Sequence, residues 1–145
     1  MGNLFLYKKG ENNQLNPLAM QTQNVDFLIN EADELLNFAK DELSRSKEDV
    51  ASFLVCHNSR KSILNYLTSF LMREGIDPKQ PITMANLMQQ CQNEDARFEN
   101  LDISDILCRF EDHEEEYCLS VEKVKECMDV AELVRGLVVN PTPGY

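Results

Sequence analysis

The chain has 145 residues, enough for one domain with a single hydrophobic core. Its formal net charge of -11 excludes a general affinity for nucleic acid, because such binding depends on Lys and Arg side chains that displace counterions from phosphates. Gly and Pro number only five each, and this scarcity of helix-breaking residues favours an α-helical protein.

No segment has the apolar length of a transmembrane helix, and the first residues lack the apolar run and cleavage site of a secretion signal. The five cysteines are odd in number, and several fall at apolar helix positions, as expected for reduced and buried thiols. We therefore expect a cytoplasmic protein that does not bind membranes.

Residues 1–23 are rich in Asn and Gln and show no sustained apolar period, which predicts a loosely ordered N-terminal arm. From residue 24, apolar residues recur at three- and four-residue steps and predict a helix over 24–43. Phe27 and Phe38 are expected to project to one side of its main apolar stripe. The resulting wide apolar arc predicts a second contact surface on this helix.

A second long helix is predicted over residues 46–75, and we expect it to be the longest. Ser46, followed by acidic residues, has the pattern of an N-cap. Gly75 is suited to the position just after a helix, and Pro78 and Pro81 require a loop beyond it.

Thr83 is predicted to cap a short third helix, which precedes a polar stretch over residues 92–99. A fourth short helix is expected over 103–110. The acidic block at 111–116 then interrupts the apolar pattern and predicts a solvated segment.

Ser120 is predicted to cap a long closing helix that stops at Asn140, before the short tail 141–145. Residues 24–140 should therefore form one domain. The expected fold is an all-α closed bundle of about five helices, with two long antiparallel helices, a long C-terminal helix and two short ones.

His57 and Arg60 stand out because helical spacing places them within an otherwise apolar arc of the second helix. A buried guanidinium needs polar partners, so an internal polar network is the first interpretation. A homodimer seam and a ligand pocket remain the alternatives. The predicted dimer seam consists of Phe27, Phe38, Phe53, His57 and Arg60.

The sequence contains no recognised catalytic motif, so we expect no catalytic residues and no cofactor. Cys108, His113, Cys118 and Cys127 have the right side chains for zinc but lack the paired spacing of structural zinc sites. We therefore predict no metal site.

Four segments of the chain, 32–39, 56–67, 82–88 and 124–138, together resemble the HEPN family of small helical bundles. The resemblance extends from about residue 24 to 139. It implies two long antiparallel helices, shorter helices after them and a closing helix. It is a likeness of helical pattern rather than of a catalytic signature.

The HEPN resemblance implies several functions, because the family includes ribonucleases, partners of minimal nucleotidyltransferases and modules that bind nucleotides, often as dimers. The family's nucleases carry an Arg-x4-6-His motif, whereas here Arg109 and His113 are one residue too close. Many members have His where this chain has Ile82. If a nucleotide site is retained, the residues expected to form it are His57, Arg60, Lys61 and Asn65.

The leading hypothesis is a non-enzymatic HEPN-like binding module that forms a homodimer and has a possible nucleotidyltransferase or other protein partner. One alternative is a residual nucleotide-binding or RNA-processing enzyme. Another is a structural interaction protein whose N-terminal arm docks on a different chain. Nucleic acid is not an expected partner.

Overall fold

The computed structural model describes residues 17–101 and 120–140, with side chains from residue 23 onward. These ranges contain four α-helices and two 3-10 turns: α3 (Pro17–Leu43), η1 (Lys47–Asp49), α4 (Ser52–Arg73), α5 (Met84–Glu94), η2 (Ala96–Asn100) and α7 (Val121–Val139). The prediction of an all-α protein is therefore confirmed for the described part of the chain.

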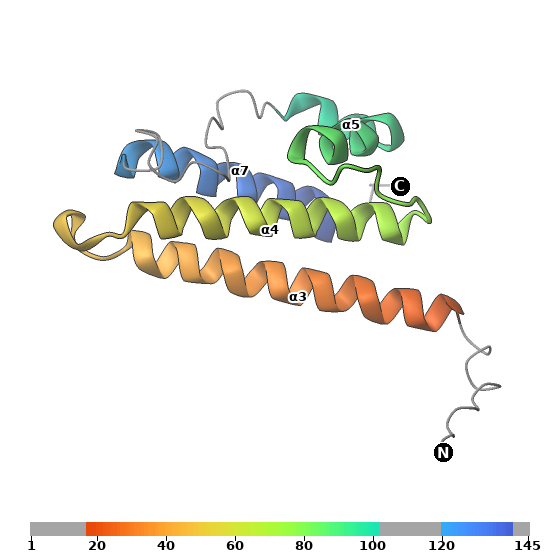
Figure 1. The fold of residues 1–145 in the computed structure, drawn as a ribbon, viewed down its shortest axis with the longest axis horizontal. Helices are drawn as coiled ribbons and strands as arrows, with labels where there is room; N and C mark the ends of the chain where they lie inside the picture. The colour runs from red at the N-terminus through yellow and green to blue at the C-terminus, as the bar shows by residue number, and fades with distance from the viewer. Residues whose placement is uncertain (1–16, 102–119, 141–145) are drawn as a thin grey trace, which may run out of the picture.

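Helix α4 is the central helix of the bundle (Figure 1). Helix α3 runs antiparallel to α4 on one side, and α5 lies on the opposite side. Helix α7 packs against both α4 and α3. Arg73, near the end of α4, donates a hydrogen bond of 2.9 Å to the carbonyl of Val138, near the end of α7. Helices α4 and α7 therefore run in the same direction.

The hydrophobic core lies around α4 and draws on all four α-helices. Its largest fully buried side chains are Tyr66, Phe98, Leu36, Ile63, Leu67, Leu71, Leu87, Val55, Val124, Val134, Val138 and Cys56. Most of them occupy the apolar stripes that the three- and four-residue periods predict.

Helix α3 begins at Pro17, inside the segment predicted to be an arm, and at 27 residues it is longer than the 22-residue α4. Proline fits the first position of a helix because its ring presets φ and its missing N–H has no intrahelical partner there. The apolar residues 18–20 are consecutive rather than periodic, so they gave no helical signal. The predicted start at residue 24 was thus too late.

The predicted start of the second helix at Ser46 was wrong. Ser46 precedes the 3-10 turn η1, and its hydroxyl donates to the Asp49 carboxylate at 2.7 Å instead of accepting from a backbone amide. At the true start of α4, the buried Glu42 carboxylate accepts a hydrogen bond of 2.7 Å from the Ala51 N–H. A side chain of α3 therefore satisfies a free amide at the beginning of α4.

The predicted end of this helix near Gly75 is confirmed. Gly75 has a φ of +77°, which residues with a Cβ rarely adopt. The Gly75 N–H donates to the Met72 carbonyl at 3.0 Å, and the Ile76 N–H donates to the Leu71 carbonyl at 2.9 Å. These two bonds form the Schellman motif, which ends a helix with its last carbonyls satisfied.

Two further predicted caps are also confirmed. The Thr83 hydroxyl accepts a hydrogen bond from the Asn86 N–H at 3.1 Å at the start of α5. The Ser120 hydroxyl accepts from the Lys123 N–H at 3.2 Å at the start of α7, and α7 ends with Asn140 as its C-cap.

Replacing Thr83 by alanine should lower the free energy of unfolding by about 1 kcal/mol, because an amide at the start of α5 loses its side-chain acceptor. The matched control is Ser46→Ala, which removes a hydroxyl that caps no amide and should cost less than about 0.5 kcal/mol. Urea denaturation followed by far-ultraviolet circular dichroism measures both values. Equal losses for the two variants would contradict the assignment of the caps.

The stretch over residues 92–99 is more structured than its polar sequence predicted. Residues up to Glu94 continue α5, and the following turn η2 buries Phe98 completely. The Phe98 ring meets the Phe70 ring edge to face, with 4.9 Å between the ring centroids. One aromatic side chain thus attaches the segment after α5 to the central helix.

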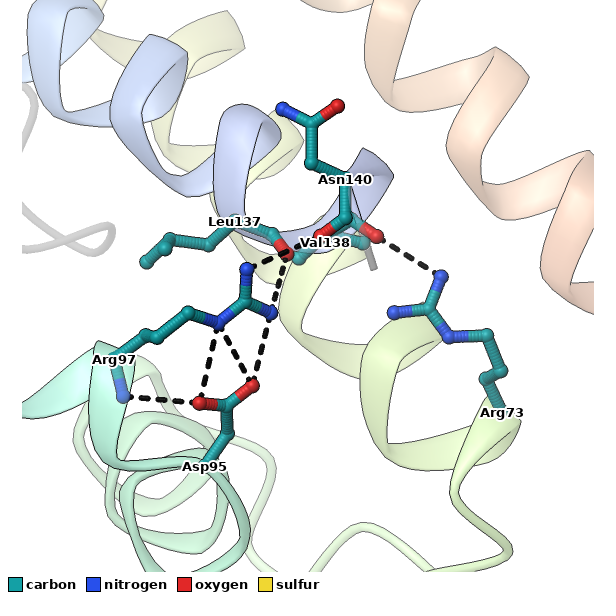
Figure 2. Close-up of polar contacts among 6 residues, drawn as sticks. All are labelled: Arg73, Asp95, Arg97, Leu137, Val138 and Asn140. Carbon is teal, nitrogen blue, oxygen red and sulfur yellow. Dashed lines mark hydrogen bonds and ion pairs between the residues drawn. The ribbon is translucent and has the colours of Figure 1, made fainter. Parts of the chain in front are cut away.

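Two arginines hold the C-terminal end of α7 (Figure 2). Arg97 donates to the carbonyls of Leu137 and Asn140 at 3.0 and 3.1 Å, while the Asp95 carboxylate accepts three further bonds from its guanidinium. Arg73 approaches the same helix end from α4. Positively charged side chains are stabilising at this position, because the last carbonyls of a helix lack intrahelical partners and carry partial negative charge.

Several predicted features lie outside the described residues: the arm up to residue 16, the short helix at 103–110, the acidic block at 111–116 and the tail at 141–145. The zinc candidates Cys108, His113 and Cys118 and the Arg109–His113 pair fall there as well. Among the residues that the structure describes, no helix is both long enough and apolar enough to cross a membrane.

Candidate functional site

The residues predicted to bind a nucleotide do not all point to one side of α4. Arg60 is buried, with 9% of its surface exposed, His57 is half-buried and Lys61 is exposed. Asn65 faces α3, where its amide donates to the Glu31 carboxylate at 3.1 Å. Because successive residues turn by about 100°, Arg60 and Asn65 point in directions about 140° apart. Nucleotide binding by this set stays a prediction.

A polar network joins α3, α4 and α7 through Asp33, Tyr66 and Arg135. The buried Tyr66 hydroxyl donates to Asp33 Oδ1 at 2.5 Å, and Arg135 Nε donates to the same oxygen at 2.8 Å. Burial, then the hydrogen bond to Asp33, raises the pKa of Tyr66. Burial also acts to raise the pKa of Asp33, but the bonds from Arg135 and Tyr66 outweigh it and the pKa is lowered. The three groups thus stay a neutral phenol, a carboxylate and a guanidinium near neutral pH.

A groove of about 340 Å³ lies between α3 and α7 next to this network. Lys40 and Glu132 pair across it at 2.7 Å, as do Asp33 and Arg135 at 2.8 Å. Every charged side chain that lines the groove is therefore paired with an opposite charge on the other helix. These two ion pairs hold α3 against α7, and they leave no unpaired charge in the groove that could bind a charged ligand.

The outer face of α3 has a different character, because two large aromatic side chains are exposed there. Phe27 is 66% exposed and Phe38 is 48% exposed, whereas the core-facing Ala32, Leu36 and Ala39 are buried. At about 100° per residue, the two phenylalanines point away from the core and within about 20° of each other. In Figure 1, α3 lies along one side of the bundle.

Glu31 and Glu34 lie between the two phenylalanines on the same face. Positions 27, 31, 34 and 38 follow the i, i+4, i+7, i+11 spacing that places residues in one row along a helix. We call Phe27, Glu31, Glu34 and Phe38 the α3 stripe. It is about 16 Å long at 1.5 Å per residue.

The α3 stripe contains only apolar and acidic side chains. The sole basic residue of α3 is Lys40, which pairs with Glu132 on α7. Glu34 is exposed, and no ion pair within residues 17–101 and 120–140 involves it. The stripe therefore has negative potential between two hydrophobic ends.

The predicted dimer seam is divided between two faces of the molecule. Phe53 is 46% exposed, but it lies on α4 about 140° around the helix from Tyr66, which faces α3 and α7. Arg60 is buried rather than on the surface. Only the Phe27 and Phe38 part of the predicted seam forms an exposed face on α3.

The groups that could bind a metal and the cysteine thiols were predicted features of this chain, and the structure bears on both within the described residues. No group of His, Cys, Asp and Glu within 17–101 and 120–140 has an arrangement that could hold a metal ion. Cys56, Cys91 and Cys127 are buried, and burial raises the pKa of the Cys91 thiol to about 12, so it is not a thiolate nucleophile at neutral pH.

Comparison of this chain with protein-family models, with curated proteins and with solved structures finds no match. The candidate site therefore rests on the geometry and chemistry of the α3 stripe alone.

Proposed function

We propose that this chain is a non-enzymatic helical binding module that docks a partner protein on the outer face of α3. The observation that carries the proposal is the exposure of Phe27 and Phe38 on one face of a helix whose other side is packed. Exposed aromatic side chains that lie on the same face of a helix are typical of protein interaction surfaces, and they add little to the stability of an isolated domain.

A homodimer through the same face is the second candidate, and it follows the sequence-based prediction. The spacing of the α3 stripe reads the same in both directions, so a second copy can place phenylalanine against phenylalanine in either orientation. Each orientation, however, also sets glutamate against glutamate. Like charges held opposite each other destabilise an interface, so a different partner protein fits this face better than a second copy.

The HEPN relationship stays a prediction on which this proposal does not depend. The resemblance implies two long antiparallel helices, shorter helices after them and a closing helix, and among the described residues α3, α4, α5 and α7 follow one another in this order. Many unrelated functions share simple helical bundles, so the proposal rests on the exposed face.

Photo-crosslinking tests the proposal. A benzophenone amino acid placed at position 27 or 38 should form an adduct with one defined protein in the cells that make this chain. The matched control is position 53, a phenylalanine on α4 whose exposed fraction of 46% is close to the 48% of Phe38, and it should give no such adduct. The same adduct should form when the two purified proteins are mixed. Adducts only between copies of this chain, or equal yields at position 53, would overturn the proposal.

A further inference from the structure

We infer that the partner segment docked on the α3 stripe is a basic amphipathic helix whose lysine or arginine side chains face Glu31 and Glu34. The inference rests on the proposed function and adds the chemistry of the partner. It follows from the order of side chains along the stripe, which is aromatic, acidic, acidic, aromatic.

The length of the stripe, and the position of its four residues in one row, favour a helix as the docked element. Four contact positions in one row over about 16 Å match the side chains that another helix presents at i, i+4, i+7 and i+11. The partner should therefore carry apolar residues at the two ends of such a row. Those residues would cover the rings of Phe27 and Phe38, which are the most exposed apolar part of the face.

The negative charge of the stripe favours basic residues at the two middle positions of the partner helix. Among the described residues, Glu34 takes part in no ion pair, and Glu31 accepts a side-chain hydrogen bond only from the neutral Asn65 amide. Covering two carboxylates with apolar side chains would remove water without replacing its hydrogen bonds. Lysine or arginine supplies the opposite charge and the donors, and their aliphatic stems can lie against the phenylalanine rings.

The same charges disfavour two other occupants of an exposed aromatic face. Phosphates of nucleic acid and anionic lipid headgroups would be repelled by Glu31 and Glu34. The Lys40 ammonium does not offset this repulsion, because it is paired with Glu132.

A designed peptide tests the inference directly. The probe is an alanine-based helix with Leu, Lys, Lys and Leu at positions i, i+4, i+7 and i+11, and the matched probe has Glu in place of both Lys. We expect the lysine peptide to bind the full chain at least about tenfold more tightly than the glutamate peptide in fluorescence anisotropy at moderate salt. Equal affinities of the two peptides would overturn the inference.

Substitutions in the chain locate the contact. Glu34→Lys should weaken binding of the lysine peptide at least about tenfold and strengthen binding of the glutamate peptide. The control Glu126→Lys makes the same change of net charge on an exposed position of α7 and should alter binding less than about twofold. Equal effects of the two variants would show attraction to the overall negative charge and would overturn the inference.

The test separates this inference from the proposed function. Phe27→Ala should weaken binding of the lysine peptide, whereas Phe53→Ala, on α4, should not. If crosslinking at positions 27 and 38 captures a partner but binding is insensitive to the sign of the peptide charge, the basic partner is wrong and the docking face stands. If crosslinking at 27 and 38 equals that at 53 and Phe27→Ala leaves peptide binding unchanged, the docking face is wrong as well.

Discussion

Replacing Phe98 by alanine should lower the free energy of unfolding by about 3–5 kcal/mol, the largest effect expected for any single change considered for this chain. The Phe98 side chain is fully buried and packs edge to face on Phe70. Its removal would leave a cavity between η2 and α4 and would also forfeit the aromatic contact. Small domains are stable by only about 5–15 kcal/mol, so the variant should lose a large share of its stability.

The matched control for this change is Phe53→Ala, which removes the same side chain from a position that is 46% exposed. We expect it to cost less than about 1 kcal/mol. Urea denaturation followed by circular dichroism suits both variants, because the chain has no tryptophan for fluorescence. A loss below about 1 kcal/mol for Phe98→Ala would mean that η2 does not pack on α4 as described.

Replacing Arg97 by methionine should cost about 2–3 kcal/mol, the second largest expected effect. Methionine keeps most of the apolar stem but leaves the Leu137 and Asn140 carbonyls without their donor and the Asp95 carboxylate without its cation. The control is Lys125→Met, which breaks an exposed pair with Asp129 within α7 and should cost less than about 0.5 kcal/mol.

The pH dependence of the Arg97 contact has a definite sign. The side-chain hydrogen bonds from Arg97 lower the pKa of Asp95 below its ordinary value of 3.8. A carboxyl with a lowered pKa in the folded state stabilises the fold above its unfolded pKa, and this stabilisation is lost as the pH falls through the folded value. Asp95→Asn should therefore be less stable than the parent at pH 7, and the difference should shrink below about pH 4. A difference that stays constant from pH 7 to pH 3 would contradict the ion pair.

The outer face of α3 was only partly predictable from the sequence. The period of apolar residues indicated that Phe27 and Phe38 lie off the main stripe, and the structure places both on the exposed face. The prediction that Phe53 and Arg60 belong to the same surface required knowledge of where α3 and α7 lie around α4. Helical periodicity gives directions around one helix only, so it cannot decide which sides the neighbouring helices cover.

The sequence by itself determined the helical class and the helix ends at Thr83, Ser120 and Gly75. These features depend on residues within about four positions of one another, because caps and Schellman motifs are closed by local hydrogen bonds. The true start of α4 was not accessible in this way, since its capping carboxylate, Glu42, comes from the preceding helix.

Only the tertiary structure decided the features that join distant segments. Arg97 reaches carbonyls at residues 137 and 140, and Tyr66 meets Asp33 and Arg135 from two other helices. Phe98 lies in a stretch that looks polar in sequence, and it is buried because α4 presents Phe70 beside it. These contacts arise when helices far apart in the chain pack together, and no local pattern of residue types encodes which partners meet.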